Sequence, residues 1–162
     1  MKKAAVCLLL ILFSTSVICA EVTRKKIRGP DGTKEHVFYS GEKEVARQIV
    51  DKNGNIIKIT GKIPDGVVKG YYDNGALSGM WSYKNDKKEG VVKEYYKDGK
   101  LLEESNYKNG RLEGTAKLYY KNGKVADVFT YKNGQLINRK TYDMKGILRL
   151  ERDFPVEKRV GR

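Results

Sequence analysis

Residues 66–137 repeat one short pattern three times, as GVVKGYYDNGALSGMWSYKNDKKE (66–89), GVVKEYYKDGKLLEESNYKNGRLE (90–113) and GTAKLYYKNGKVADVFTYKNGQLI (114–137). The period is 24 residues without a gap, and each copy opens with a glycine that is followed five residues later by a Tyr-Tyr pair. A fixed period of this size is typical of repeat proteins, in which each unit packs against its neighbours. We therefore expect these three copies to decide the fold.

Turn dipeptides such as Asn-Gly and Asp-Gly divide each copy into two segments rich in tyrosine and aliphatic residues. These dipeptides tolerate the positive φ values of tight turns and are the strongest short-range hairpin signal. The spacing of the turns alternates between 11 and 13 residues, which leaves room for one strand and one turn. The sequence predicts an all-β fold, a single-layer antiparallel β-meander or solenoid of tandem hairpins, with one hairpin per copy.

Side chains alternate between the two faces of a strand, so equivalent residues of successive copies should form columns. We expect one aromatic column to provide either cohesion or partner contact, namely Trp81, Tyr83, Tyr107, Phe129 and Tyr131. A lysine column, formed by Lys69, Lys93 and Lys117, should lie beside the first tyrosines of the three copies. Further lysines occupy the turns, and acidic residues are interleaved with them. The lysines therefore have a structural interpretation, as solubilising edge residues, besides a binding one.

The pattern G-x-x-x-x-Y-Y-x-N-G-x-L…Y-x-N-G resembles the MORN repeat in its bacterial variant form, which occurs in the YwqK-type antitoxin family. The first copy carries it as Gly66, Tyr71, Tyr72, Asn74, Gly75, Leu77, Tyr83 and Asn85, and the next two copies carry it from Gly90 and from Gly114. The resemblance implies a curved β-sheet strip that binds proteins or sometimes lipids. It specifies a fold far better than a function.

Residues 1–20 have the features of a secretory signal peptide. Lys2 and Lys3 precede an apolar stretch too short to span a bilayer, and small residues lead to a cleavage point after Ala20. An uncleaved anchor and a lipoprotein modified at Cys19 are the alternatives. Cleavage would remove both cysteines and lower the formal net charge from +13 to +11. We expect an exported protein, periplasmic or secreted, that is held together without disulfides.

The flanking segments look like weaker copies of the same pattern. Residues 21–65 begin with a basic lead, either flexible or an edge strand, and continue as degenerate repeats in which 44–50 and 55–60 form a hairpin. Residues 138–162 should supply a degenerate repeat, a cap over the last edge and a charged tail. The expected domains are thus 1–20, 21–65, 66–137 and 138–162.

The chain offers little for catalysis or for metal binding. Its one histidine, His36, is more simply a strand residue than a ligand or a base, and no metal-ligand spacing, phosphate loop or nucleophile motif occurs. Neighbouring acids such as Glu103 and Glu104 should point to opposite faces of a strand. We expect a protein that is no enzyme and needs no cofactor.

Three functions remain open. The first is an exported protein-interaction module or scaffold in the bacterial envelope or outside. The second is a peripheral binder of an anionic lipid or envelope polymer through the lysine columns. The third, implied by the resemblance alone, is an antitoxin-like or immunity-like protein. Nucleic acid is a less suitable partner for an exported chain, although basic surfaces with aromatics bind single strands.

Overall fold

The computed structural model describes residues 21–29 and 32–155, and these form strands and turns without a helix. The predicted signal peptide and charged tail lie outside the described residues. The strands are β1 (Val22–Arg28), β2 (Lys34–Ser40), β3 (Lys43–Val50), β4 (Ile56–Gly61), β5 (Gly66–Tyr71), β6 (Leu77–Lys84), β7 (Lys87–Tyr95), β8 (Leu101–Lys108), β9 (Arg111–Leu112), β10 (Gly114–Tyr119), β11 (Val125–Lys132), β12 (Gln135–Tyr142) and β13 (Leu148–Asp153). The predicted all-β fold of tandem hairpins is confirmed.

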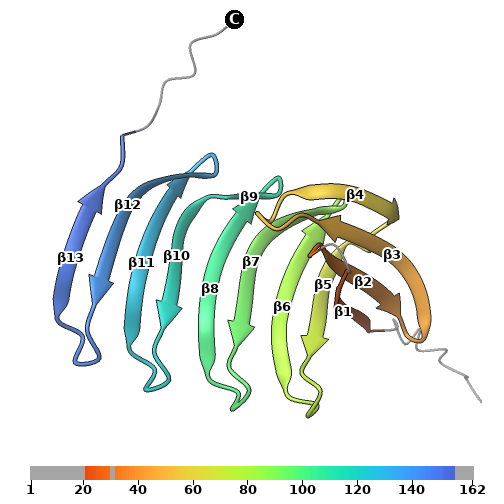
Figure 1. Ribbon diagram of the computed structural model, residues 1–162, viewed down its shortest axis with the longest axis horizontal. Helices are drawn as coiled ribbons and strands as arrows, with labels where there is room; N and C mark the ends of the chain where they lie inside the picture. Colours follow the sequence, from red (N-terminus) through yellow and green to blue (C-terminus); the bar gives the residue numbers. More distant parts are fainter. Residues whose placement is uncertain (1–20, 30–31, 156–162) are drawn as a thin grey trace, which may run out of the picture.

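All of these strands belong to one open sheet, which runs from β13 through β8 and β5 to β1 and ends at β4 (Figure 1). From β5 to β13 the strands form the predicted antiparallel meander, with β9 paired to β8. The expected continuation upstream is different, because β5 pairs with β1 rather than with β4. This pair is parallel and short, with Val22 opposite Val68 and Thr23 opposite Lys69. The basic lead is therefore an interior strand, and the sheet is mixed.

Two kinds of turn alternate along the repeats. The turns at Asn85-Asp86, Asn109-Gly110 and Asn133-Gly134 have positive φ at both residues, as in type I′ hairpins. The opposite turns have positive φ only at glycine, as at Gly75, whose N–H donates to Tyr72 O at 2.9 Å. That pattern is a type I turn followed by a left-handed residue, which adds one residue to the loop. This alternation of loop lengths, together with register shifts within the strands, gives the alternating turn spacing in the sequence.

Hydrogen bonds that recur once per copy tie each copy to the next. The second tyrosine of each Tyr-Tyr pair donates its hydroxyl to a backbone carbonyl of the following copy, from Tyr72 to Tyr95, from Tyr96 to Tyr119 and from Tyr120 to Tyr142, at 2.5 to 2.8 Å. At the opposite edge, an acid before each opening glycine accepts from the N–H of a turn asparagine. These pairs are Asp65 with Asn85, Glu89 with Asn109 and Glu113 with Asn133. The Tyr-Tyr pairs thus serve cohesion between copies.

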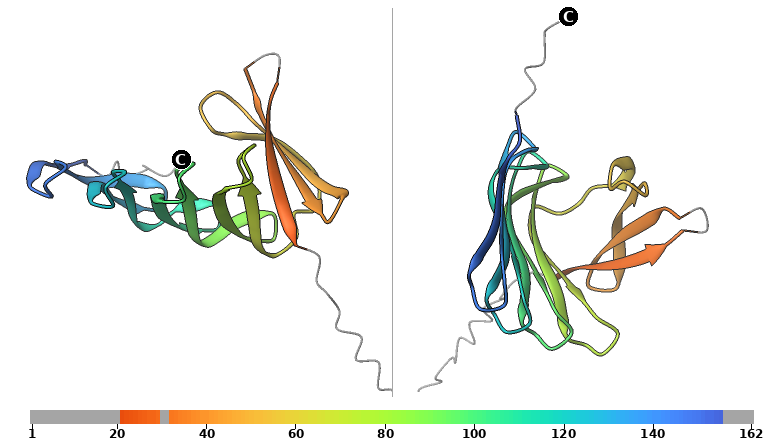
Figure 2. Two further views of the ribbon diagram at one scale, coloured as in Figure 1. Left: turned by 90° about the horizontal axis from the view of Figure 1, so that it is seen from below. Right: turned by 60° about the vertical axis from the view of Figure 1, so that its left-hand side comes forward.

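The main hydrophobic core lies where the N-terminal strands fold over the first copies. Phe38 and Ile63 are fully buried there, and Phe38 meets Tyr83 edge-on with ring centroids 5.4 Å apart. Figure 2 shows β1 to β4 diverging from the strip of later strands, so that the sheet has a second layer at this end. The expectation of a single layer therefore holds only for the later strands, because the parallel β1–β5 pair lets the N-terminal strands turn across the sheet.

Two glycines make room for the only tryptophan in the sequence. Gly70 and Gly79 lie opposite one another in β5 and β6, and the indole of Trp81 covers both. A Cβ atom at Gly70 would lie 2.8 Å from Trp81 Cζ3, and one at Gly79 would overlap Trp81 Cζ2. Packing of this kind, in which an aromatic ring covers strand glycines, explains why these glycines occur inside strands rather than at turns.

Candidate functional site

The face of the sheet that carries Trp81, here called the inner face, is covered at one end and open at the other. All five predicted contact aromatics lie on it, since the strand register places Val68 opposite Trp81, Gly90 opposite Tyr107 and Ala116 opposite Phe129. Trp81 and Tyr83 are each 3 % exposed beneath the N-terminal strands. Tyr107, Phe129 and Tyr131 are partly exposed. The first two aromatics therefore provide cohesion, and the other three form a surface that nothing in the described chain covers completely.

Arg24 of β1 shows how the covered end is held. Its guanidinium carbon lies 3.3 Å from the centroid of the Trp81 ring, a cation–π contact, and burial lowers the pKa of this arginine. Trp81 Nε1 donates to Glu94 at 3.1 Å. Sequence reasoning missed Arg24, because its role depends on the β1–β5 pairing and a basic residue in a basic lead carries no local signal.

The open part of the inner face combines aromatic rings with charges. Lys88 lies over the ring of Tyr107 at 4.6 Å, and the Phe129 and Tyr131 rings are 6.3 Å apart. Arg139 of β12 lies over Phe129 at 5.2 Å and bonds to Asp127 at 2.8 Å. The surface therefore offers apolar contact area, and its cations are bound to rings or carboxylates within the chain.

Burial also shifts the titration of the groups beneath this surface. Burial, with repulsion from Arg24, lowers the pKa of Lys88 to about 8. Burial and the neighbouring Glu94 raise the pKa of Glu103 above its ordinary value, because the two acids lie directly opposite one another in β7 and β8. Burial and Glu103 raise the pKa of Tyr107 to about 12. On this face the buried cation Lys88 is thus balanced by the carboxylates Glu94 and Glu103.

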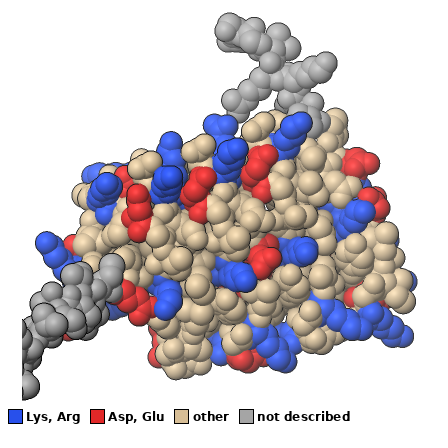
Figure 3. Space-filling model, turned by 180° about the vertical axis from the view of Figure 1, so that it is seen from behind, with Lys and Arg blue, Asp and Glu red and all other residues tan. Residues whose placement is uncertain are grey.

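The predicted lysine column lies on the other face, and two of its lysines form ion pairs. Lys69 bonds to Glu21 at 3.1 Å and Lys93 to Glu104 at 3.2 Å. Lys117 lies opposite Glu104 in the β8–β10 register. Figure 3 shows basic and acidic side chains alternating over this side of the molecule without a continuous basic patch. The column is therefore largely neutralised by acids that stand beside it.

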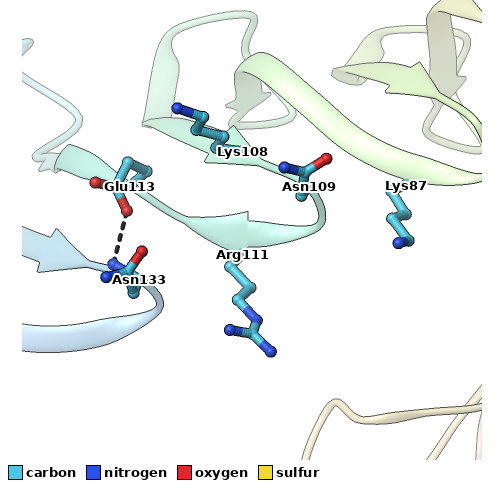
Figure 4. A pocket seen from close by; sticks show the side chains of 6 residues that line it. All are labelled: Lys87, Lys108, Asn109, Arg111, Glu113 and Asn133. Atoms are coloured by element: carbon cyan, nitrogen blue, oxygen red, sulfur yellow. Dashed lines mark hydrogen bonds between the residues drawn. The ribbon is translucent and has the colours of Figure 1, made fainter.

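The turns at Asn85-Asp86, Asn109-Gly110 and Asn133-Gly134 lie along one side of the strip, here called the turn edge. Cations at this turn edge have a different environment from those of the lysine column. Two hollows of about 330 and 220 Å³ recur there one copy apart. The first is lined by Lys87, Lys108, Asn109, Arg111, Glu113 and Asn133 (Figure 4), and the second by Lys84, Asn85, Lys87, Glu89 and Asn109. Glu89 and Glu113 accept backbone N–H groups of the turns, whereas the four lining cations form no ion pair with any described residue.

Residues 21–29 and 32–155 contain no group of three or more metal-ligating side chains that could hold an ion. His36 lies in β2, where its Nδ1 is 3.2 Å from Gln48 Oε1, and burial lowers its pKa to about 4. No helix within the described ranges is long and apolar enough to cross a membrane.

Comparison with known families agrees with the repeat architecture. Residues 64–85, 88–109 and 112–133 each match the MORN repeat variant, in a phase two residues ahead of the copies defined from the sequence. No curated protein matches the chain. The three matched segments span most of β5 to β11, including the open part of the inner face. The chain thus carries three tandem repeats of the MORN repeat variant type, as the sequence pattern predicts.

Proposed function

We propose that this protein is a non-catalytic binding module that takes a partner protein on the open part of its inner face. The observation that carries the proposal is the contrast along one aromatic column. At one end, Trp81 and Tyr83 are covered by strands of the same chain, and at the other, Phe129 and Tyr131 remain partly exposed. Tyrosine and other aromatic side chains are favoured in protein interfaces because they bury a large apolar area.

The covered end suggests the chemistry of the partner. There, an arginine stacks on an aromatic ring and a phenylalanine meets Tyr83 edge-on. Tyr107 and Tyr131 are the counterparts of Tyr83 in the next two copies, and Glu103 lies on the same face beside Tyr107. A partner segment that presents an apolar side chain to these tyrosines and a cation to Glu103 would reproduce the contacts that the N-terminal strands make.

The cellular setting is part of the proposal. The basic start, short apolar stretch and small residues before Ala20 support export to the periplasm or beyond, in a bacterial envelope. Proteolytic release after Ala20 would be seen as an N-terminus at Glu21 in protein recovered from the envelope. An antitoxin-like or immunity-like role is a variant of the same binding function, and it rests only on the resemblance of the repeats to the YwqK-type family.

The test is capture of a partner from envelope extract with the wild-type chain and with two variants, at low and at high salt. Substituting Phe129→Ser together with Tyr131→Ser should abolish capture of a discrete protein. The matched control, Tyr119→Ser, removes an aromatic ring from the opposite face of the same hairpin and should leave capture unchanged. Equal capture by all three folded proteins would reject the inner face as the binding surface.

A second candidate function is binding of an anionic polymer or lipid surface, and the turn edge favours it over the lysine column. Lys87, Lys108 and Arg111 surround a hollow together with the side chains of Asn109 and Asn133. Exposed cations without ion-pair partners keep their full charge available for an anionic ligand. Hollows one copy apart lie two strands apart, roughly 9–10 Å, which suits a linear polymer with regularly spaced charges.

This candidate is tested by the salt dependence of binding to an acidic polysaccharide and to anionic vesicles. Binding should weaken steeply with salt, because exposed charges are screened within roughly 10 Å at 0.1 M ionic strength. Lys87→Gln with Arg111→Gln should remove it, whereas Lys69→Gln with Lys93→Gln should change it little. The reverse pattern would indicate that the lysine column, and not the turn edge, binds the anionic ligand.

A further inference from the structure

The last strand of the sheet is open along its outer edge. β13 pairs with β12 on one side, and no described strand lies on its other side (Figure 1). All six of its residues are exposed, and Leu148 and Leu150 are 46 % and 51 % exposed. An exposed edge strand with aliphatic side chains is a template for pairing with another chain. No described residue covers this edge, and β13 carries four charged residues.

The free side of β13 presents a regular set of backbone groups. Phe154 N–H donates to Ile137 O of β12 at 2.9 Å, so the backbone of Phe154 points inward. Because backbone groups alternate in direction along a regular strand, those of Glu151 and Asp153 point to the free side. The register shift opposite Thr141 and Tyr142 interrupts this alternation at Arg149. In the preceding copy, the same side of β11 is filled by β12. β13 thus offers a pairing edge that the repeat uses elsewhere.

The charges of β13 select one way in which two copies could pair there. Two antiparallel strands side by side in one sheet are related by a two-fold axis normal to the sheet, which keeps each side chain on its own face. An axis at Arg149, Glu151, Arg152 or Asp153 would place two like charges directly opposite one another, which is destabilising. An axis at Leu148 would place Arg149 opposite Ile147, without an opposite charge. An axis at Leu150 instead places Arg149 of each copy opposite Glu151 of the other, and Leu150 opposite Leu150.

We propose that β13 is a self-association edge, through which two copies pair antiparallel about Leu150 and form one continuous sheet. In this register Glu151, whose backbone groups point to the free side, lies opposite Arg149 of the other copy. Leu150 forms the closer, non-hydrogen-bonded pair, where Cα atoms are about 4.5 Å apart. Arg149 bonds to Asp143 and Glu151 to Lys140 within the chain, and their side chains remain 61 % and 45 % exposed.

At the opposite end of the sheet, the charges of β4 favour no register of self-pairing. β4 also exposes aliphatic side chains, Ile56, Ile57 and Ile59, but Lys58 is its only charged residue. A lone edge lysine opposes pairing between strands. No opposite charge faces Lys58 in any symmetric register of β4. The argument for pairing with a second copy therefore applies to β13 and not to β4. In the resulting dimer the two inner faces lie on the same side of the sheet.

The test is sedimentation equilibrium of the full chain with charge variants of β13. The wild-type chain should dimerise reversibly. Arg149→Glu and Glu151→Arg should each weaken the dimer roughly tenfold or more, because each turns two attractive cross-strand pairs into repulsive ones. An equimolar mixture of these two variants should dimerise again, since every pair then joins opposite charges. A wild-type chain that stays monomeric up to millimolar concentration, or a mixture that stays monomeric, would overturn the proposal.

Two controls separate this pairing from other association. Arg152→Glu makes the same charge change as Arg149→Glu but places the new charge opposite Leu148, so the dimer should persist. With Cys7 and Cys19 replaced by serine, Leu150→Cys should form a disulfide across the axis, because non-hydrogen-bonded Cα atoms lie within disulfide range. Leu148→Cys should not, because residue 148 faces residue 152. Equal cross-linking of both cysteine variants would reject this register.

Discussion

The first copies and the last copies of the repeat are built alike but are stabilised differently. Both consist of hairpins with the same two turns and the same tyrosine hydrogen bonds to the next copy. At the β5–β7 end, however, the N-terminal strands bury Trp81, Tyr83 and Val92 almost completely. From β8 to β13, Ser105 and Ala116 are the buried residues. One end thus has a hydrophobic core, and the other depends on contacts between neighbouring copies.

This difference indicates where the protein can form a binding surface without losing its fold. An aromatic side chain can contact a partner only if the fold does not require it to be buried within the chain. Trp81 is fixed between two glycines and an arginine, whereas its counterpart two copies later, Phe129, lies partly exposed beneath Arg139. The same repeat position is therefore structural in one copy and accessible in another.

The largest effect should come from removing the contact between the two layers. Phe38→Ala should lower the free energy of unfolding by about 3–5 kcal/mol, the usual cost of deleting a buried aromatic ring. Phe129→Ala, at the open end, should cost much less, about 1 kcal/mol, since less area is lost from the buried state. Chemical denaturation followed by circular dichroism measures both values. Similar losses for both variants would contradict the proposed difference between the two ends.

A smaller effect should follow from filling the space beneath the tryptophan. Gly79→Ala should destabilise the protein by about 1–3 kcal/mol, because the added methyl group overlaps the indole in a well-packed site. The counterparts of Gly79 in the next copies are Glu103 and Asp127, so the backbone itself accepts a side chain there. The double variant Gly79→Ala with Trp81→Leu should therefore lose less stability than the sum of the losses of the two single variants. Additive losses would indicate that the glycine matters for another reason.

The hydrogen bonds between copies should contribute less per residue. Tyr96→Phe removes the hydroxyl that donates to Tyr119 O at 2.7 Å and should cost about 0.5–1.5 kcal/mol. The equivalent Tyr72→Phe, nearer the two-layered end, should cost a similar amount globally but leave amide exchange in β10 to β13 unchanged. Hydrogen exchange of the two variants thus shows whether the last copies open separately from the first. Identical exchange patterns would show that the sheet opens as one unit.

The smallest effect should be the change in stability with pH that comes from protonation of His36 in β2. Burial lowers the pKa of His36 from 6.5 to about 4 in the folded protein. Between these two values the unfolded chain binds more protons, so the contribution of His36 to stability is present above pH 6.5 and is lost as the pH falls toward 4. His36→Gln should flatten the stability profile in this window relative to wild type. An unchanged profile from pH 6.5 to 4 would show that His36 does not carry this dependence.

The sequence predicts local features well and long-range contacts poorly. The period, the Asn-Gly turns and the strands of residues 44–60 follow from local chemistry and are confirmed. The pairing of β1 with β5 could not be foreseen, because it joins segments more than forty residues apart through only two residue pairs. The two-layered core and the role of Arg24 depend on that pairing.

The candidate surface shows the same limit. Alternation predicted that the five aromatics share one column and that the lysine column lies beside the first tyrosines of the copies. The strand register, not the alternation, shows that the two columns lie on opposite faces. It could not separate buried from open aromatics, since that depends on the N-terminal layer. Nor could it show that Glu21 and Glu104 neutralise the lysine column, because Glu21 reaches Lys69 only through the β1–β5 pair.

The tyrosine hydrogen bonds between copies also bear on how this array can change in length. Each bond joins a copy only to the next one, at a separation of 22 or 23 residues. An additional 24-residue unit inserted between existing units would form the same bonds on both sides without disturbing distant contacts. The N-terminal layer and the final strand could then stay as they are while the open surface between them grew by two strands per duplication. Such extensibility lets the footprint for a partner lengthen in fixed steps.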